Sequence, residues 1–359
     1  ASGGSTRGGA RRGAGGTPSH HHQNTPGLRR PLARRDPVVV HAPYWTAMAK
    51  HADIVVPSTT AYEREDYSGS RNDPLLVAMR ALTEPYAESR DDYDTFAALA
   101  ERLGVGDQFT QGRTARQWLQ HMYEKWAAGL DFAAPTFDQF WADGQLRLPT
   151  EPGLTLLSDF RADPHTHRLH TPSGRIEIFS ADIDGFGYAD CVGHPAWFEP
   201  TEWLGGERAA TFPLHLLANQ PASRLHSQLD TGALSQGSKV SGREPIRMHP
   251  EDAAERGWAD GDVVRVYNDR GACLAGVVTD AGVRPHVVQL STGAWYDPLD
   301  PADPDALCVH GNPNVLTDDV GTSALARGCT GAHVLVQVEK FAGPLPPVRA
   351  HQPPVFAER

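Results

Sequence analysis

The sequence has little of what marks several common classes of protein. It has four cysteines, Cys191, Cys273, Cys308 and Cys329, and none of them forms a CxxC pair, which disfavours a zinc ribbon or a dense disulfide framework. We therefore expect buried, reduced thiols. No run approaches the ~18 apolar residues of a membrane span. Basic residues are fewer than acidic ones, 33 against 44, so a nucleic acid is not the expected partner.

The first residues also contain few large apolar side chains. Residues 1–36 carry seven Arg and one Asp and are rich in Gly, which is typical of a disordered tail or a basic arm. The pair Arg11-Arg12 is similar to part of a twin-arginine export signal, but no apolar segment follows it. We therefore reject a signal peptide here and predict that residues 1–14 are an atypical, disordered start.

A regular pattern begins at residue 37. The stretches 37–42 (PVVVHA), 45–52 (WTAMAKHA) and 53–60 (DIVVPSTT) predict a strand, a short helix and a second strand. That order is typical of a parallel sheet buried on both faces.

Two longer helices are predicted over 90–104 and 114–129. Each places three large apolar residues on one face: Phe96, Leu99 and Leu103 in the first, and Trp118, Met122 and Trp126 in the second. We expect these faces to be buried in a core, and we expect the aromatic residues to pack there and not to stack on a cofactor.

The second half of the sequence has a different composition and a different pattern of predicted elements. Residues 130–210 are rich in Pro and Gly and include a short predicted strand at 174–180. Beyond them, strands are predicted at 212–218, 285–291 and 331–341, a helix at 249–257, and a hairpin over 262–280 with its turn from Asn268 to Gly271. Many short strands around one helix indicate a β-barrel, followed by an extended proline-rich tail from Gly343.

Three polar loops stand beside these apolar strands: the opening stretch leading to 58–66, the loop 218–228 and the loop 310–323. Their amides are Gln23, Asn24, Asn219, Gln220, Gln228 and Asn314. Guanine and pterin present adjacent N–H donors and a carbonyl on one edge, which the Asp66 carboxylate and such amides can match. Arg224, and backbone N–H groups near Gly15 and Gly16, can pair with a pyrophosphate. The alternative is that these loops merely turn the chain.

Three consecutive histidines, His20, His21 and His22, raise the question of a metal site. Adjacent residues on an extended chain point to opposite faces, so the three rings cannot easily reach one ion. No neighbouring carboxylate or cysteine completes the usual zinc spacing. We therefore predict no metal-binding residues, and a histidine-based metallohydrolase has little support.

Together, these loops resemble the molybdopterin-dependent oxidoreductases of the dimethyl sulfoxide reductase family, in the branch of the biotin sulfoxide, methionine sulfoxide and trimethylamine N-oxide reductases. The similar stretches are GGTPSHHHQN, YWTAMAKHADIVVPSTTAYERED, TPSGRIEIFS, SRLHSQLD and GNPNVLTDDVGTSALARGCTG. The resemblance extends from about Gly15 to Phe341. It implies an α/β fold class, in which a partial parallel-sheet domain precedes a C-terminal six-stranded, double-psi-like β-barrel.

The resemblance also implies a bis(molybdopterin guanine dinucleotide) cofactor with a central molybdenum. Residues matching the motifs around one guanosine-pyrophosphate arm are Gly15, Gly16, Gln23, Asn24 and Asp66. Those matching the barrel side are Arg224, His226, Ser227, Gln228 and Asn314. At three positions, Thr17, Asn24 and Ala332 replace residues that are usual in the family.

The activity implied is oxygen-atom transfer from an S-oxide or N-oxide. In the family the molybdenum ligand belongs to an N-terminal portion that this chain does not match, so we predict no catalytic residue here. We interpret the chain as the C-terminal part of such an enzyme, with that portion, on the same or a separate chain, as its partner. The alternative is a cofactor-binding module without catalysis. The expected compartment is the cytoplasm, with a periplasmic enzyme as the alternative. The predicted domains are 1–14, 15–205, 206–342 and 343–359.

Overall fold

The computed structural model describes residues 22–32, 37–70, 73–150, 153, 155–326, 328 and 333–355. The predicted disordered start at 1–14, together with Gly15 and Gly16, lies outside these residues. The chain divides into two compact units. One contains the described residues up to Val40, Trp45–Ile54 and the chain from Glu177 onward, and the other contains His41–Tyr44 and Val55–Ile176.

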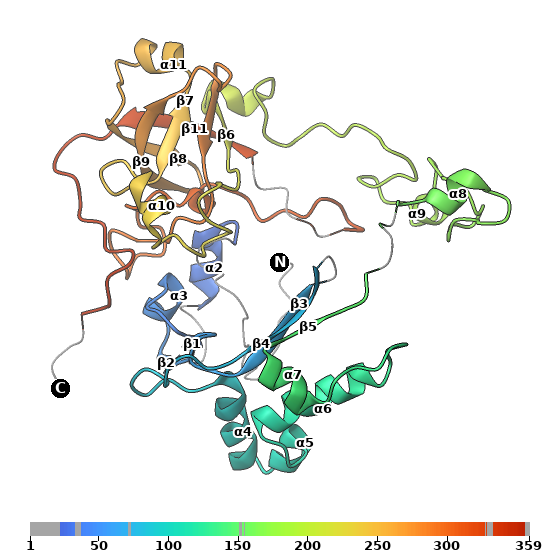
Figure 1. The fold of residues 1–359 in the computed structure, drawn as a ribbon. Coiled ribbons are helices and arrows are strands. Elements are labelled where there is room, and N and C mark those ends of the chain that lie inside the picture. The colour runs from blue at the N-terminus through green and yellow to red at the C-terminus, as the bar shows by residue number, and fades with distance from the viewer. Residues whose placement is uncertain are drawn as a thin grey trace. The chain divides into compact units, whose positions relative to one another are not determined.

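The first unit is built on a closed barrel of six strands, which confirms the predicted C-terminal barrel (Figure 1). The strands are β6 (Leu214–Leu217), β7 (Pro245–Met248), β8 (Val263–Asn268), β9 (Gly271–Thr279), β10 (Val287–Leu290) and β11 (His333–Lys340). Around the barrel they follow the order β10-β6-β11-β8-β9-β7. The pairs β10–β6 and β7–β9 are parallel, and the other pairs are antiparallel.

Local sequence signals explain two elements of the barrel. The hairpin β8–β9 turns where predicted, because Asn268 pairs with Gly271 and its Oδ1 atom accepts a hydrogen bond from the Arg270 N–H. Helix α11 (Pro250–Glu255) has proline in its first turn, as predicted. It closes one end of the barrel in Figure 1, where Ala253 and Trp258 join the apolar core.

The barrel interior is packed with fully buried aliphatic side chains, among them Leu216, Ile246 and Leu290. Cys273 and Cys308 lie in the same core as free thiols, as predicted, and burial raises the pKa of both. Cys191 is only half-buried, and Cys329 lies outside the described residues.

Two short helices from the N-terminal half belong to the barrel's unit. The predicted strand, helix and strand are β1 (Val39–Ala42), α3 (Ala47–Lys50) and β2 (Ile54–Pro57), and β1 pairs with β2 in a two-stranded sheet. Before them, α2 (Thr25–Leu32) is held by Arg29, whose guanidinium donates to Tyr296 Oη at 2.7 Å and to the Pro301 and Asp303 carbonyls. The packing units therefore divide the chain differently from the predicted sequence domains, whose boundaries stay predictions.

The second unit combines an antiparallel sheet with helices. Its strands are β3 (Asp66–Ser70), β4 (Asp73–Met79) and β5 (Gln145–Arg147), and its helices are α4 (Asp92–Arg102), α5 (Gly106–Thr110), α6 (Ala115–Ala127) and α7 (Phe137–Asp143). Thr114 and Thr136 begin α6 and α7 with capping boxes. An aromatic core of Tyr123, Phe137 and Phe140 joins α6 and α7 to Leu76 of β4.

The prediction of a buried helix face was wrong for α4 and right only in part for α6, where Trp126 packs against the aromatic core. Phe96 and Leu99 of α4 are each 45% exposed, and Leu103 is 65% exposed. In α6, Met122 is exposed and the buried residues are Leu119 and Tyr123. Helical periodicity shows which residues share a face, but it does not show which face another element covers.

The predicted strand at 174–180 is also wrong. These residues form bends and irregular chain, and Ile176 and Ile178 are largely exposed, because no neighbouring strand pairs with them. Among the described residues between 148 and 213, the only regular elements are the short helices α8 (Ser158–Ala162), α9 (Ala181–Gly185) and η1 (Glu207–Ala210). Within the described residues, no helix is both long enough and apolar enough to cross a membrane.

The barrel core yields a stability prediction. Leu290 is fully buried, whereas Leu299 is 58% exposed. We expect Leu290→Ala to lower the free energy of unfolding by ~2–5 kcal/mol, because the lost burial and the remaining cavity both cost stability. Leu299→Ala should change it by no more than about 0.5 kcal/mol. Denaturant unfolding of both variants measures the difference, and equal losses would contradict this account of the core.

Candidate functional site

One predicted polar loop, 218–228, leaves the barrel beside the segment that follows β10, which the sequence analysis did not single out. Strands β6 and β10 are neighbours and run parallel, so the segments that follow them, 218–230 and 291–297, begin side by side. The Asn219 carbonyl accepts a hydrogen bond from Thr292 N at 2.9 Å, and Asn219 Oδ1 accepts one from Ser291 Oγ at 3.1 Å. Loops at the carboxyl ends of parallel strands are common places for ligands.

A second predicted polar loop, 310–323, reaches the same edge. His310 Nδ1 lies 2.8 Å from the Trp295 carbonyl, and the chain then enters the short helix η2 (Pro313–Val315). Asn314 is buried there, and its backbone N–H donates to Asn312 Oδ1 at 2.9 Å. The structure thus brings Asn314, in its loop, to the same barrel as the loop 218–230.

The segment 224–230 alternates between buried and exposed side chains. Arg224, Ser227 and Asp230 are buried, whereas His226 and Gln228 are exposed. His226 and Leu229 have φ angles of 52° and 66°, in the left-handed region that non-glycine residues rarely adopt. The surrounding structure must offset that strain, which is of order 1–3 kcal/mol per residue.

Gly293 fits closely against this segment. Its φ is +92°, and a Cβ atom at this position would stand 1.5 Å from the His226 carbonyl oxygen. Any other residue would therefore displace the backbone that carries His226. The close approach of the segment 224–230 thus requires glycine at position 293.

Four charged side chains are enclosed beneath the segment. The Arg224 guanidinium, which is fully buried, donates to Glu244 Oε1 at 2.8 Å and to the Thr292 carbonyl. Lys239 Nζ lies 2.8 Å from Asp230 Oδ1 and 2.7 Å from Glu244 Oε2. We call Arg224, Asp230, Lys239 and Glu244 the buried charge cluster. In this arrangement the Arg224 donors already have protein partners, so its predicted contact with a pyrophosphate stays a prediction.

Asp230 has the most partners in this cluster. Its Oδ1 also accepts from Ser235 Oγ at 3.1 Å, in the short helix α10 (Ala233–Gly237). Its Oδ2 accepts from the Trp295 N–H at 3.1 Å and lies 3.0 Å from His351 Nε2. Burial alone would raise the pKa of Asp230, but His351 and Lys239 outweigh burial and hold this pKa far below its usual range.

Asp230, His310 and His351 are close enough to suggest a metal site, because one ligand atom of each lies within 4.8 Å of the others. Other contacts already occupy these atoms. Lys239 neutralises Asp230, and the Nδ1 atom of His310 bonds to the Trp295 carbonyl. We therefore interpret this group, the one of its kind found in the described part of the chain, as a hydrogen-bonded network.

The other predicted residues of this unit, Gln23 and Asn24, directly precede helix α2. Asn24, with φ of 52°, precedes the helix, and its Oδ1 atom accepts a hydrogen bond from Gly27 N at 3.0 Å. Asn24 is therefore a helix cap, a role that sequence reasoning missed. Because α2 lies beside η2, Gln23 and Asn24 belong to the same unit as the barrel loops. Gly15 and Gly16 are outside the described residues.

Asp66 belongs to the second unit, where it begins β3. Its Oδ2 atom lies 2.6 Å from Arg64 Nη1, and its Oδ1 accepts a hydrogen bond from Tyr67 N at 2.9 Å. The side chain is 35% exposed, so a carboxylate edge is still accessible to a ligand.

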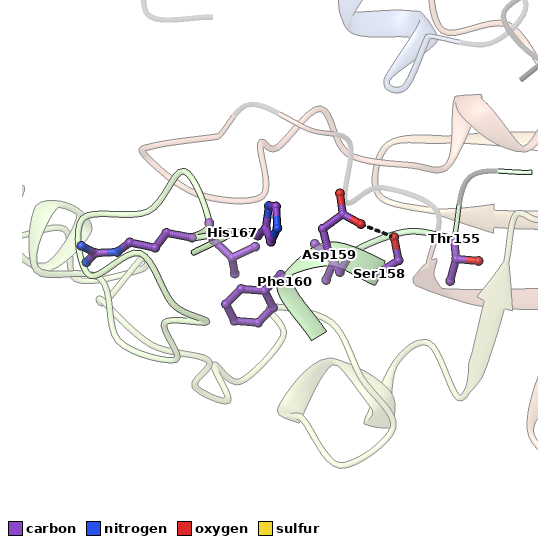
Figure 2. A pocket seen from close by; sticks show the side chains of 8 residues that line it. Thr155, Ser158, Asp159, Phe160 and His167 are labelled. Atoms are coloured by element: carbon purple, nitrogen blue, oxygen red, sulfur yellow. Dashed lines mark hydrogen bonds between the residues drawn. The ribbon is translucent and has the colours of Figure 1, made fainter. Parts of the chain in front are cut away.

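Two surface hollows are lined by residues outside the loops described above. One of about 270 Å³ is lined by residues 155–169 alone, and Figure 2 shows the Ser158 hydroxyl donating to Asp159 beside it. A second, of about 400 Å³, lies between α4 and α5 and is lined by apolar residues such as Phe96 and Phe109. None of the predicted site residues lines either hollow.

Comparison with known proteins places two family models on the chain. A molydopterin dinucleotide binding domain matches residues 214–334, and a molybdopterin oxidoreductase model matches residues 13–102. The first match covers β6 to β10, the start of β11 and the loops at their edge.

Individual relatives agree with these models. The chain is 46% identical over 337 residues to a dimethyl sulfoxide/trimethylamine N-oxide reductase of Cereibacter sphaeroides, covering 92% of this chain and 41% of that protein. It is 43% identical to a biotin sulfoxide reductase of the same organism (92% and 44%), and 40% identical to trimethylamine-N-oxide reductase 1 of Escherichia coli K12 (92% and 40%). The chain thus spans about two fifths of the length of these relatives.

A solved structure resembles the fold. Acetylene hydratase from Pelobacter acetylenicus superposes with a TM-score of 0.68 over 89% of this chain and 42% of that one, at 18% identity. At this identity the likeness concerns the fold alone.

The loop edge yields a prediction about pH. Burial and, next, the Lys239 ammonium lower the pKa of His310 to about 3. In the unfolded chain this histidine has an ordinary pKa of ~6.5. Between about pH 3 and ~6.5 the unfolded chain thus binds a proton here that the folded protein does not. The free energy of unfolding should therefore fall as the pH falls below ~6.5, by up to ~1.4 kcal/mol per unit from this residue.

Denaturant unfolding measured at several pH values between about 7.5 and 5 tests this prediction. In this range Asp230 does not contribute, because its protonation lowers the free energy of unfolding only below about pH 4. His310→Asn is the comparison, because its stability should depend less steeply on pH. Parallel profiles for the two proteins would contradict the assigned shift.

Proposed function

The chain belongs to the molybdopterin-dependent oxidoreductases of the dimethyl sulfoxide reductase family, and we propose that it forms the dinucleotide-binding part of an oxide reductase. The family models imply bis(molybdopterin guanine dinucleotide) with molybdenum as the cofactor. One observation carries the proposal: the edge where the loops 218–230, 291–297 and 310–317 meet lies inside the region matched by the dinucleotide-binding model.

The residues at this edge fit such a group chemically. His226 and Gln228 are exposed and carry hydrogen-bonding groups of the kind that a guanosine and a pyrophosphate need. The nearby carboxylates of Asp230 and Glu244 are buried and paired with Lys239 and Arg224. They therefore do not oppose the approach of a phosphate.

The predicted residues divide into two roles within the proposal. His226 and Gln228 contact the dinucleotide, whereas buried Arg224, Ser227 and Asn314 set the shape of the loops that carry them. Gln23, Asn24 and Asp66, with Gly15 and Gly16, belong to the other dinucleotide arm. When bound, the cofactor supplies the oxygen-atom transfer chemistry, and this chain binds and orients it.

An S-oxide or N-oxide is the proposed substrate class, because the relatives are named for dimethyl sulfoxide, trimethylamine N-oxide and biotin sulfoxide. The molybdenum ligand and the rest of the substrate cavity come from further polypeptide, which is the chain's proposed partner. A binding module without catalysis is the second candidate, supported by the match of the dinucleotide-binding model to residues 214–334.

Asp66 gives a test of the dinucleotide assignment. We expect Asp66→Ala to weaken dinucleotide retention in the complete enzyme by about 10- to 150-fold, because a lost hydrogen bond to a charged group costs ~1.5–3 kcal/mol. Glu65→Ala is the matched control, since Glu65 pairs with Arg116 at 2.8 Å on the surface. Dinucleotide content after extensive dialysis measures retention. Equal retention in both variants would count against the role of Asp66.

The second test concerns the chain alone. Purified from a host that makes the cofactor, it should contain only trace molybdenum and should not reduce methionine sulfoxide with a reduced viologen donor, because catalysis needs a metal held in a shaped, dry cavity. Adding the missing portion should restore both. Stoichiometric molybdenum with steady turnover would overturn the proposal and direct a search for a ligand to Ser227, Cys273, Cys308 and Cys329. A loaded but inactive complex would favour the binding module.

A further inference from the structure

The C-terminal segment 343–352 is fixed to the barrel by its backbone. Arg243 donates to the Pro346 carbonyl at 2.5 Å, and the Arg349 N–H donates to Asp297 Oδ2 at 2.5 Å. Lys50 Nζ lies 2.8 Å from both the Arg349 and Ala350 carbonyls. The segment is therefore held in a defined path, although it has no helix or strand of its own.

This path delivers one side chain to the buried charge cluster. His351 Nε2 lies 3.0 Å from Asp230 Oδ2. The imidazole ring packs edge-on against Trp295 and His310, with ring centroids 4.9 Å and 5.2 Å apart. At 24% side-chain exposure, His351 is the most accessible partner of the Asp230 carboxylate.

From Asp230 the contacts continue into the loop that carries His226 and Gln228. The same Oδ2 atom accepts a hydrogen bond from the Trp295 N–H, and the Trp295 indole Nε1–H donates to the Ser227 carbonyl at 2.9 Å. Ser227 lies between the two exposed residues. A shift of Trp295 would therefore move the backbone that presents them.

We propose that Asp230 and His351 are positioning residues, which together hold Trp295 so that the segment 226–229 presents His226 and Gln228 to the dinucleotide. This inference rests on the proposed function. The C-terminal segment thereby contributes to cofactor binding without touching the cofactor. The strain at His226 and Leu229 supports it, because a strained loop keeps its shape only while its neighbours enforce it.

The experiment uses the full chain assembled with its partner portion in a host that makes the cofactor. The variants are His351→Ala, His351→Gln, Trp295→Phe and the control Arg247→Ala, which removes a surface ion pair with Asp280 elsewhere on the barrel. Dinucleotide is counted as GMP released by acid hydrolysis at intervals during dialysis. Thermal unfolding of each cofactor-free protein is recorded in parallel.

His351→Ala should lose dinucleotide about tenfold faster than the parent protein, while its unfolding temperature stays close to that of Arg247→Ala. His351→Gln should restore retention, because its amide can donate to Asp230 as the imidazole does. Trp295→Phe keeps the aromatic bulk but loses the indole donor, so it should show a similar loss. The double variant His351→Ala/Trp295→Phe should lose dinucleotide no faster than either single variant, because both changes break the same chain of contacts.

Equal retention in His351→Ala and the parent protein would overturn the inference while leaving the proposed function intact. A loss that His351→Gln does not restore, or one that follows unfolding temperature across all variants, would likewise overturn it in favour of a purely structural role. If the parent assembly itself holds no GMP, the proposed function fails, and that outcome differs from failure of the positioning role.

Discussion

The enclosure of four charges at the loop edge is the constraint on which the rest of this site depends. Arg224 and Lys239 are almost completely buried with Asp230 and Glu244. Charges removed from water are costly unless each is paired and hydrogen-bonded, and removing one partner typically costs ~3–5 kcal/mol. The four side chains must therefore keep their relative positions. The loops that contribute them, before and after α10, are fixed with them.

This requirement accounts for features that would otherwise be separate. Gly293 is needed because the His226 carbonyl lies where a Cβ atom would be, and the left-handed residues His226 and Leu229 are tolerated because both ends of their segment, at Arg224 and Asp230, are anchored. Anchoring the backbone through its buried residues fixes the positions of the intervening exposed side chains. In the proposed function, the network thus separates structural residues from dinucleotide-contacting residues within a seven-residue segment.

The sequence predicted the barrel well because its signals are local. Pro250 begins α11 and the Asn268–Gly271 turn joins β8 to β9, and neither depends on distant contacts. The helix face of α4, and in part that of α6, was predicted wrongly because periodicity does not reveal the covering element. At the candidate site the loops were found from their amide-rich composition. Lys239, Glu244 and His351 were missed, since no local pattern shows that they join Asp230 and Arg224 in one cluster; His351 is 121 residues from Asp230 along the chain.

Preorganisation links this structure to cofactor binding. A large, flexible dinucleotide loses conformational freedom when it binds, and a loop that also had to become ordered would reduce the affinity further, by ~0.5–1.5 kcal/mol for each immobilised side chain. Here the ordering of the segment 224–230 is provided by folding, through the buried charge cluster and the contacts of Trp295. If His226 and Gln228 contact the dinucleotide as proposed, their binding energy is not spent on ordering the loop. The proposal therefore makes the stability of the barrel and its affinity for a dinucleotide depend on the same buried contacts.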